Sequence, residues 1–252
     1  MSTTDLLFLL LLLVTLYCTI RFKKLTLAGA LVAGLIGGAV YLGAGMKGIS
    51  LLGSFFLLGT LTTAWQSASK ISIGAATNMD GQRNAGQVLA NGGVAALCGV
   101  MAWLFPNHSP LLQLMMAASL AAATADTISA ELGTVYGSKF YNSLNFTNGR
   151  RGDDGVVSLE GTLAGIAGAA IIAGVHLVFT TDFSSLPIIL LAGALGNLAD
   201  SLLGATLEKR KILNNDGVNF LNTLTGALVA WLLSLLMSQG NGLGKNSTLL
   251  WL

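Results

Sequence analysis

Long apolar stretches dominate this sequence. Eight of them have membrane-spanning or near-spanning length, at about residues 4–20, 25–46, 49–66, 86–105, 110–130, 159–180, 186–204 and 218–238. The chain is 53% hydrophobic and 10% charged, and no single soluble core requires apolar residues over nearly its whole length. The sequence therefore predicts one all-α integral membrane domain over residues 1–252, a polytopic transmembrane bundle of about eight helices.

The first apolar stretch differs from a secretory signal. It has an acid, Asp5, before the apolar run and basic residues after it, which is the reverse of a signal peptide. We expect residues 1–24 to form a peripheral, retained helix whose N-terminus is external. The net charge of +2, with no basic run among aromatics, gives no support for nucleic-acid binding. Cys18 and Cys98 lack CxxC spacing and are interpreted as packing residues.

The loops between the apolar stretches alternate in charge. Eleven basic residues fall on one side, namely Arg21, Lys23, Lys24, Lys70, Arg83, Lys139, Arg150, Arg151, Lys209, Arg210 and Lys211. The other side has Lys47 and Lys245. The positive-inside rule predicts that the eleven are cytoplasmic and that both termini are external. Every long polar loop is then cytoplasmic.

The cytoplasmic loops contain an internal repeat. The segment RRGDDGVVSLEGTLAG, residues 150–165, matches LNNDGVNFLNTLTG, residues 213–226, with one gap, and each follows an Ala-Asp-Thr/Ser motif. A fainter third copy has Asp80-Gly81 in the place of Asp154-Gly155. We expect repeated helix-loop-helix hairpins that pack through abundant Gly and Ala.

Two acids lie within apolar stretches. An ionised carboxylate there costs a few kcal/mol and persists mostly where it faces a cavity, an ion or a partner, so Asp126 and Asp200 are the first candidate site residues. Glu208 and Asn197 would share a helical face with Asp200, a stripe that suits a cation. The alternative is that each acid lies just past the membrane edge and caps or solvates its helix.

Two further rows of polar residues lie along predicted helices. Arg83, Gln87 and Asn91 repeat at four-residue spacing, and Asn219 and Asn222 follow Asp216-Gly217. Arg83, Gln87 and Asn91 could form hydrogen bonds that hold neighbouring helices together. It could instead place Arg83 on a phosphate, with Gln87 and Asn91 orienting it.

The loop NGRRGDDGVVSLEG combines charged residues with four glycines. Arg150 and Arg151 could reach phosphates together with backbone N–H groups, while acids such as Asp154 hold Mg²⁺, and Ser158 adds a hydroxyl. The alternatives are a solvated loop and, for Glu160, a helix-capping acid. No GxxxxGK[ST] motif occurs, and two histidines make a Ser-His-Asp triad or a His-rich metal site improbable.

Five ordered motifs give the chain a family resemblance. RNAGQVLANGG, ADTISAELG, GDDGVVSLEGTLAG, ADSLLGATLE and NDGVNFLNTLTGA occur in this order. Over about residues 25–240 the chain resembles the integral membrane family that contains the plant and cyanobacterial phytyl-phosphate kinases. That family looks related to dolichol kinases and phosphatidate cytidylyltransferases, which implies an NTP-dependent and Mg²⁺-dependent site in a helical bundle.

The resemblance implies phosphoryl transfer from CTP or another NTP to a prenyl monophosphate such as phytyl phosphate, giving the diphosphate for tocopherol or prenylquinone synthesis. Asp126 and Asp200 would be the principal catalytic and Mg²⁺-binding acids, with Glu131, Asp154 and Asp216 as further candidates. The other expected nucleotide or substrate contacts are Arg83, Gln87, Asn91, Arg150, Arg151, Ser158, Asn197, Asp216, Asn219 and Asn222. A homodimer is compatible with this interpretation.

Two other functions remain compatible with the sequence. A CTP-dependent lipid cytidylyltransferase using the same residues would release pyrophosphate and leave a CDP-lipid. An ion-coupled transporter also uses intramembrane acids and hairpin repeats. The polar residues of this chain, however, gather toward one predicted face of the membrane.

Overall fold

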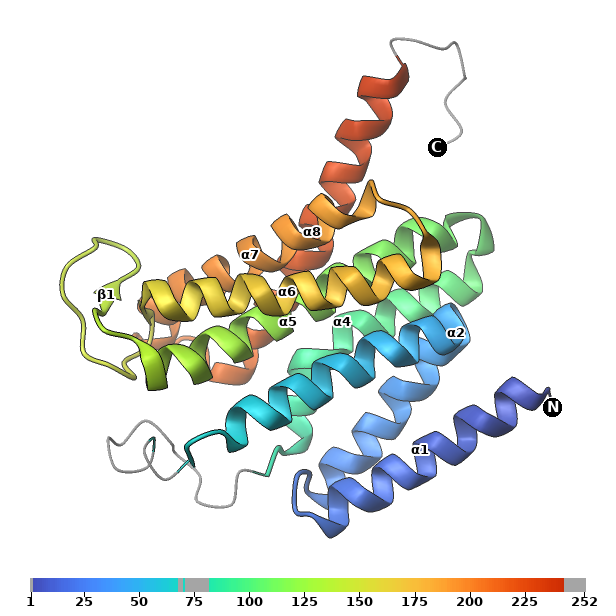
Figure 1. Cartoon of the computed structure of the whole chain (residues 1–252), viewed down its shortest axis with the longest axis horizontal. Coiled ribbons are helices and arrows are strands. Elements are labelled where there is room, and N and C mark those ends of the chain that lie inside the picture. The colour runs from blue at the N-terminus through green and yellow to red at the C-terminus, as the bar shows by residue number, and fades with distance from the viewer. Residues whose placement is uncertain (1, 68–69, 71–81, 243–252) are drawn as a thin grey trace.

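The computed structural model describes residues 2–67, 70 and 82–242, and it is a helical bundle (Figure 1). Within that part of the chain, seven helices are long and apolar enough to cross a membrane, which confirms the predicted all-α membrane fold. They are α1 (Thr3–Arg21), α2 (Leu27–Ala64), α4 (Ala85–Leu104), α5 (Ser109–Tyr136), α6 (Leu159–Thr180), α7 (Ser185–Leu203) and α8 (Asn215–Gly242). The short elements are η1 (Pro106–His108), η2 (Gly204–Glu208) and an antiparallel pair of strands, β1 (Tyr141–Asn142) and β2 (Val156–Val157).

Helix α2 joins two of the predicted stretches without a loop. A straight helix of its 38 residues would be about 57 Å long, well beyond the apolar thickness of a bilayer. Gly45 has φ +56° and ψ −144°, a conformation that favours glycine, and the chain folds back there into two arms, residues 27–44 and 46–64 (Figure 1). The expected boundary between residues 46 and 49 is therefore a kink at a single glycine.

Helix α5 lies at the centre of the bundle. It packs against α2, α4, α6, α7 and α8, and all ten residues from 116 to 125 are buried. Seven of the ten are Ala or Ser, so neighbouring backbones can approach from every side. Asp126 follows this segment directly.

The two clearer repeat copies form helix-loop-helix hairpins. In one, α5 connects to α6 through residues 137–158. In the other, α7 continues into the π-helical turn η2 and connects to α8. Asp80-Gly81 of the proposed third copy lies outside the described residues.

The predicted division of charge appears as two ends of the bundle. At one end, Arg83 N donates to Lys24 O at 2.9 Å, and Ser143 Oγ in the loop after α5 donates to Ser201 O at 3.0 Å. At the other end, Lys47 near the α2 kink donates to Gln113 at the start of α5. The eleven basic residues thus belong to the first end, which we call the polar end, and Lys245 lies outside the described residues.

The direction in which this bundle crosses the membrane can be tested by labelling. In a Cys18→Ala and Cys98→Ala background, Asn148→Cys at the polar end should react with an impermeant maleimide only from the cytoplasmic side, because the basic residues gather there. Asn107→Cys in the opposite turn should react only from outside. The reverse pattern in right-side-out and inverted vesicles would overturn the predicted orientation.

Candidate functional site

Two acids from different repeat copies meet inside the bundle. Asp126 on α5 and Asp200 on α7 bring their carboxyl groups within hydrogen-bonding reach of one another. Asp200 Oδ1 is buried and has no hydrogen-bond partner among the described residues. A buried carboxylate oxygen without a partner is costly, and a second carboxylate beside it adds repulsion. The pair is therefore arranged for a proton or a cation.

Asn222 lies one helical turn deeper than the acid pair. It is fully buried on α8, and neither its Oδ1 nor its Nδ2 has a hydrogen-bond partner among the described residues. Gly196, one turn before Asp200, makes room for it: a Cβ there would lie 2.7 Å from Asn222 Oδ1 and 2.5 Å from the Ala122 side chain. Because Ala122 also precedes Asp126 by one turn, the acids and Asn222 form successive layers between α5, α7 and α8.

Two further predicted residues, Asn197 and Asn219, lie on helices α7 and α8. Asn197 on α7 is buried, and its Nδ2 would lie 3.1 Å from a Cβ built on Gly165 of α6. Asn219 on α8 is 9% exposed and donates to Asn215 Oδ1 at 3.0 Å. The structure thus brings Asp126, Asp200 and Asn222 together, whereas Asn197 faces Gly165 of α6 and Asn219 contacts Asn215 within α8.

The loop after α5 carries a further acid toward the pair. Gly155, with φ +70°, packs against Ala205 in η2 so closely that a side chain would collide. This contact holds the neighbouring Asp154, which is exposed, within electrostatic range of Glu208. Glu208 is in turn within range of Asp200, although the π-helical turn changes the predicted four-residue spacing between them.

The other predicted residues of this loop have structural partners. Arg151 Nη2 donates to Gly137 O at 2.9 Å, and its guanidinium lies 4.9 Å from the centre of the Phe140 ring. Ser158 caps α6, accepting from Gly161 N at 3.1 Å. Glu160, for which helix capping was one alternative, lies in the first turn of α6 and accepts from Ser138 Oγ at 2.5 Å. Arg150 is exposed on the same loop.

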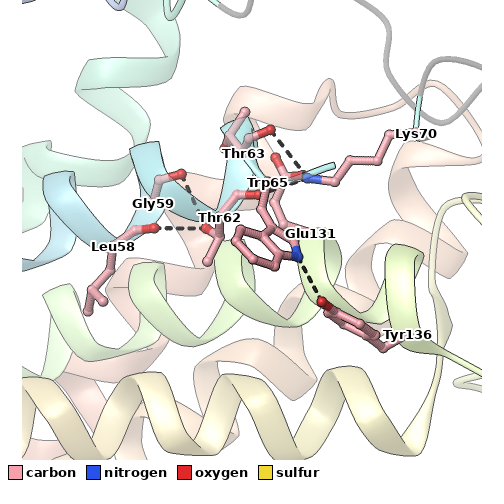
Figure 2. Close-up of polar contacts among 8 residues, drawn as sticks. All are labelled: Leu58, Gly59, Thr62, Thr63, Trp65, Lys70, Glu131 and Tyr136. Carbon is pink, nitrogen blue, oxygen red and sulfur yellow. Dashed lines mark hydrogen bonds and ion pairs between the residues drawn. The ribbon is translucent and has the colours of Figure 1, made fainter. Parts of the chain in front are cut away.

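Glu131 forms an ion pair that the sequence did not predict. Lys70 Nζ lies 2.5 Å from Glu131 Oε2 and also donates to the carbonyl oxygens of Thr62 and Thr63 at the end of α2 (Figure 2). The Lys70 side chain is 5% exposed. Lys70 was interpreted from the sequence as a topology signal, since no local pattern pairs it with an acid sixty-one residues away. Glu131 therefore ties α5 to α2 in this structure.

Arg83 lies at the same end, within electrostatic range of Glu131. Its guanidinium carbon is 5.7 Å from the centre of the Phe55 ring, and burial lowers its pKa while nearby Glu131 opposes that shift. Gln87 takes part in a capping box with Asn84, and Asn91 Nδ2 donates to Gln87 O at 3.0 Å. Asn91 Oδ1 is buried without a partner among the described residues. Gln87 thus has a helix-capping role, and of these side chains Asn91 keeps a buried oxygen that no other described residue contacts by a hydrogen bond.

Asp216 connects this group to α8. Its side chain packs against Gly86 of α4, where a Cβ would collide with it. It belongs to the first turn of α8, a position in which an acid is favoured by the helix dipole. Asp216 therefore lies between the Arg83 side of the polar end and the helices that hold the acid pair.

The acid pair could provide part of the ligand shell of a hard divalent cation. Among the described residues no three His, Cys, Asp or Glu side chains form a ready-made metal site. Mg²⁺ usually uses one or two carboxylates, with water and substrate phosphates completing its shell. Asp126, Asp200 and the amide oxygen of Asn222 are oxygen ligands of the kind that Mg²⁺ prefers, and Asp200 Oδ1 is unpartnered. The residues present thus fit a cation bound together with a phosphorylated substrate.

The Lys70–Glu131 ion pair should contribute strongly to folding. Glu131→Gln should reduce the free energy of unfolding by on the order of 3 kcal/mol, because it leaves the charge of Lys70, which is 5% exposed, without its acid. Lys70→Met should cost less, because the Glu131 side chain is 23% exposed and keeps Arg83 nearby. The double variant should lose less than the sum of the two. Unfolding in detergent measures all four proteins. Additive losses would show that the two side chains do not stabilise one another.

Several known proteins are similar to this chain in sequence. The chain matches the family described as integral membrane protein DUF92 over residues 10–227. It is 36% identical to the membrane protein MJ0933 of Methanocaldococcus jannaschii, over 75% of this chain and 77% of that protein. It is 30% identical to Protein VTE6, chloroplastic, of Arabidopsis thaliana, over 85% of this chain and 67% of that protein. For the membrane protein sll0875 of Synechocystis sp. the identity is 31%, over 82% of each chain.

No solved structure matches the chain. The family match covers the acid pair, the loop after α5 and the polar residues of α4 and α8. The resemblance predicted from the five ordered motifs is confirmed: the chain belongs to the DUF92 family of integral membrane proteins.

Proposed function

We propose that this protein transfers the terminal phosphoryl group of CTP, or of another NTP, to a prenyl monophosphate at the cytoplasmic face of the membrane. The observation that carries the proposal is the buried pair of Asp126 and Asp200, whose unpartnered oxygen lies at the end of the bundle that also holds the arginines. A lipid phosphate and a soluble nucleotide can meet only at such a membrane edge. The membership of the family and the resemblance to phytyl-phosphate kinases support the same class of reaction.

The reaction breaks the bond between the terminal phosphorus of the nucleotide and its bridging oxygen. A new bond forms from that phosphorus to an oxygen of the prenyl phosphate, so that a nucleoside diphosphate leaves and a prenyl diphosphate remains. The acceptor phosphate is already ionised, so no general base is required. Catalysis then consists mainly of positioning the groups and neutralising their charge.

The residues of the polar end divide these tasks. Asp126 and Asp200 would hold Mg²⁺, with Asn222 as a neutral oxygen ligand or orienting group. Mg²⁺ when bound supplies charge neutralisation on the transferring phosphates. Arg83 and Arg150 would contact phosphate oxygens, because a guanidinium offers paired donors to them. Asp154 and Glu208 approach the acid pair from the loop side.

Two features of the structure limit the roles of other candidates. Glu131 is engaged by Lys70, so its expected part is to hold α5 against α2 and to offset the charge of Arg83. Arg151 and Ser158 support the loop through Gly137 and the start of α6. We therefore propose Asp126, Asp200 and Arg83 as the functional centre.

Labelled nucleotide separates this reaction from that of a cytidylyltransferase, which could use the same acids. With CTP labelled at the terminal phosphate, purified protein should move the label into a prenyl diphosphate, because the bond to that phosphorus is the one that breaks. With CTP labelled at the first phosphate, the lipid should remain unlabelled. Label from the first phosphate in the lipid, with release of pyrophosphate, would instead establish cytidylyl transfer.

Replacing either buried acid should lower turnover without lowering the melting temperature. Asp126→Asn and Asp200→Asn should each lower turnover by on the order of 100-fold or more, because each removes a charged ligand. Each should leave the melting temperature unchanged or raise it, since it relieves repulsion within a buried pair. The matched control is Asp153→Asn, an exposed acid of the neighbouring loop, which should keep normal turnover. A variant of either buried acid that loses stability and keeps turnover would make that acid structural.

A further inference from the structure

Asn222 is fully buried, and neither polar atom of its amide has a hydrogen-bond partner among the described residues. A buried polar group without a partner costs about 1–3 kcal/mol, so Asn222 is an expensive residue for a packing role alone. The two other amides predicted as site residues on these helices differ from it. Asn219 donates to Asn215 Oδ1 at 3.0 Å, and Asn197 faces Gly165 of α6. Of the three amides, Asn222 is the one suited to meet a bound group.

The directions of the helices aim Asn222 and the two acids at one another. The Cα–Cβ bonds of a helix tilt toward its N-terminus. Helices α5 and α7 finish at the polar end, so Asp126 and Asp200 lean away from that end, into the bundle. Helix α8 begins at the polar end, so Asn222 leans back toward it. The amide and the two carboxyl groups therefore converge.

The contacts of Gly196 limit the distance between them. A Cβ built on Gly196 would lie 2.7 Å from Asn222 Oδ1 and 2.5 Å from the Ala122 side chain. Gly196 and Ala122 each precede one of the acids by four residues, which is about 6 Å along a helix axis. Since the side chains lean toward one another, the gap along the axis is smaller than this. Two ligands on opposite sides of one Mg²⁺ are about 4 Å apart, so the amide and the acids suit a single cation.

The other acids of the polar end do not take the place of Asn222. Glu131 is paired with Lys70. Glu208 is within electrostatic range of Asp200, but it lies toward Asp154 of the loop after α5. In the part of the chain that the structure describes, no three His, Cys, Asp or Glu side chains are positioned to hold a metal ion. The position next to the acid pair thus belongs to a neutral amide.

We propose that Asn222 is the third ligand of the cation at the acid pair, and that its neutrality makes the protein hold this cation only together with the phosphates of a nucleotide. The inference rests on the proposed function and adds to it a rule for binding: cation and nucleotide bind together. The affinity of an oxygen site for a divalent cation depends on the number of its charged ligands. Two carboxylates and an amide leave the rest of an octahedral shell to water and phosphate, so binding is weak until phosphate oxygens join.

The test replaces the amide by an acid and by a hydrocarbon of similar size. Asn222→Asp adds a third carboxylate beside the acid pair, and Asn222→Leu removes the amide. Asn148→Asp is the matched control, because it makes the same chemical change at an exposed residue of the loop after α5. The parent and the three variants are titrated with Mn²⁺, which replaces Mg²⁺ at oxygen ligands, and free Mn²⁺ is followed by electron paramagnetic resonance.

Without nucleotide, the parent and Asn148→Asp should bind Mn²⁺ weakly, and Asn222→Asp should bind it about tenfold or more tightly than they do. The second titration adds a CTP analogue in which a methylene group replaces the last bridging oxygen. The parent should then bind Mn²⁺ beyond what the analogue alone retains, and Asn222→Leu should bind it about tenfold less tightly than the parent. Equal binding by the parent with and without the analogue would overturn the inference, as would equal binding by Asn222→Asp and the parent.

Melting temperatures separate a ligand role from a packing role. Mn²⁺ alone should raise the melting temperature of Asn222→Asp and have little effect on the parent, since only the variant binds it without nucleotide. Asn222→Leu should melt at or above the temperature of the parent, because hydrocarbon replaces an amide without partners. If Asn222→Leu melts lower and binds Mn²⁺ as the parent does, Asn222 is a packing residue and the inference fails. If Asn222→Asp does not fold, the Asn222→Leu comparison decides alone.

Turnover measured on the same preparations distinguishes failure of this inference from failure of the proposed function. If the parent transfers the terminal phosphate of CTP to phytyl phosphate while all four proteins bind Mn²⁺ alike, the role of Asn222 fails alone. If Mn²⁺ binding follows the expected pattern but no terminal phosphate reaches the lipid, the role of Asn222 stands and the proposed reaction fails.

Discussion

The central physical constraint in this structure is a pair of carboxyl groups held together between membrane-spanning helices. Burying one carboxylate is costly, and placing a second beside it costs more unless a proton or a cation intervenes. Asp126 can occupy such a place because the segment before it is surrounded on every side by other helices. Small residues on α5, together with Gly196 on α7, bring the backbones close enough for the acid pair and Asn222 to lie in successive layers between the same helices.

The remaining contacts of the polar end keep this arrangement in register. Lys70 fastens the end of α2 to α5 through Glu131, and Gly155 fits the loop after α5 onto η2. Arg83 is anchored by backbone hydrogen bonds to the segment before α2. The acid pair and the Arg83 guanidinium are therefore supported by three different connections, each made by residues outside the acid pair. Such preorganisation is what phosphoryl transfer requires of a protein, since the chemistry itself needs mainly fixed charges in fixed places.

Much of this architecture could be predicted from the sequence because hydropathy is a strong signal in membrane proteins. The apolar stretches correspond to the helices, and the Ala-Asp-Thr/Ser repeat indicated that Asp126 and Asp200 are equivalent. The reversal at Gly45 could be placed only approximately, since one glycine in a glycine-rich helix carries no distinctive local pattern. The Lys70–Glu131 pair was missed for a related reason: the two residues are far apart in the chain, and a lone lysine near a membrane edge is typical of a topology signal. Ser158 and Gln87 were expected at the substrate, and the structure gives each a helix cap, a role that depends on where a helix begins.

The most direct test of the central claim is cation binding by the acid pair, measured apart from turnover. Mn²⁺ can replace Mg²⁺ at oxygen ligands, and its free concentration is followed by electron paramagnetic resonance as it is titrated into the purified protein with CTP present. If Asp126 and Asp200 are held together for a cation, the parent protein should bind Mn²⁺ beyond what CTP alone retains, and Asp126→Asn and Asp200→Asn should each weaken that binding about tenfold or more. Binding that is absent from the parent, or equal in parent and variants, would contradict the claim.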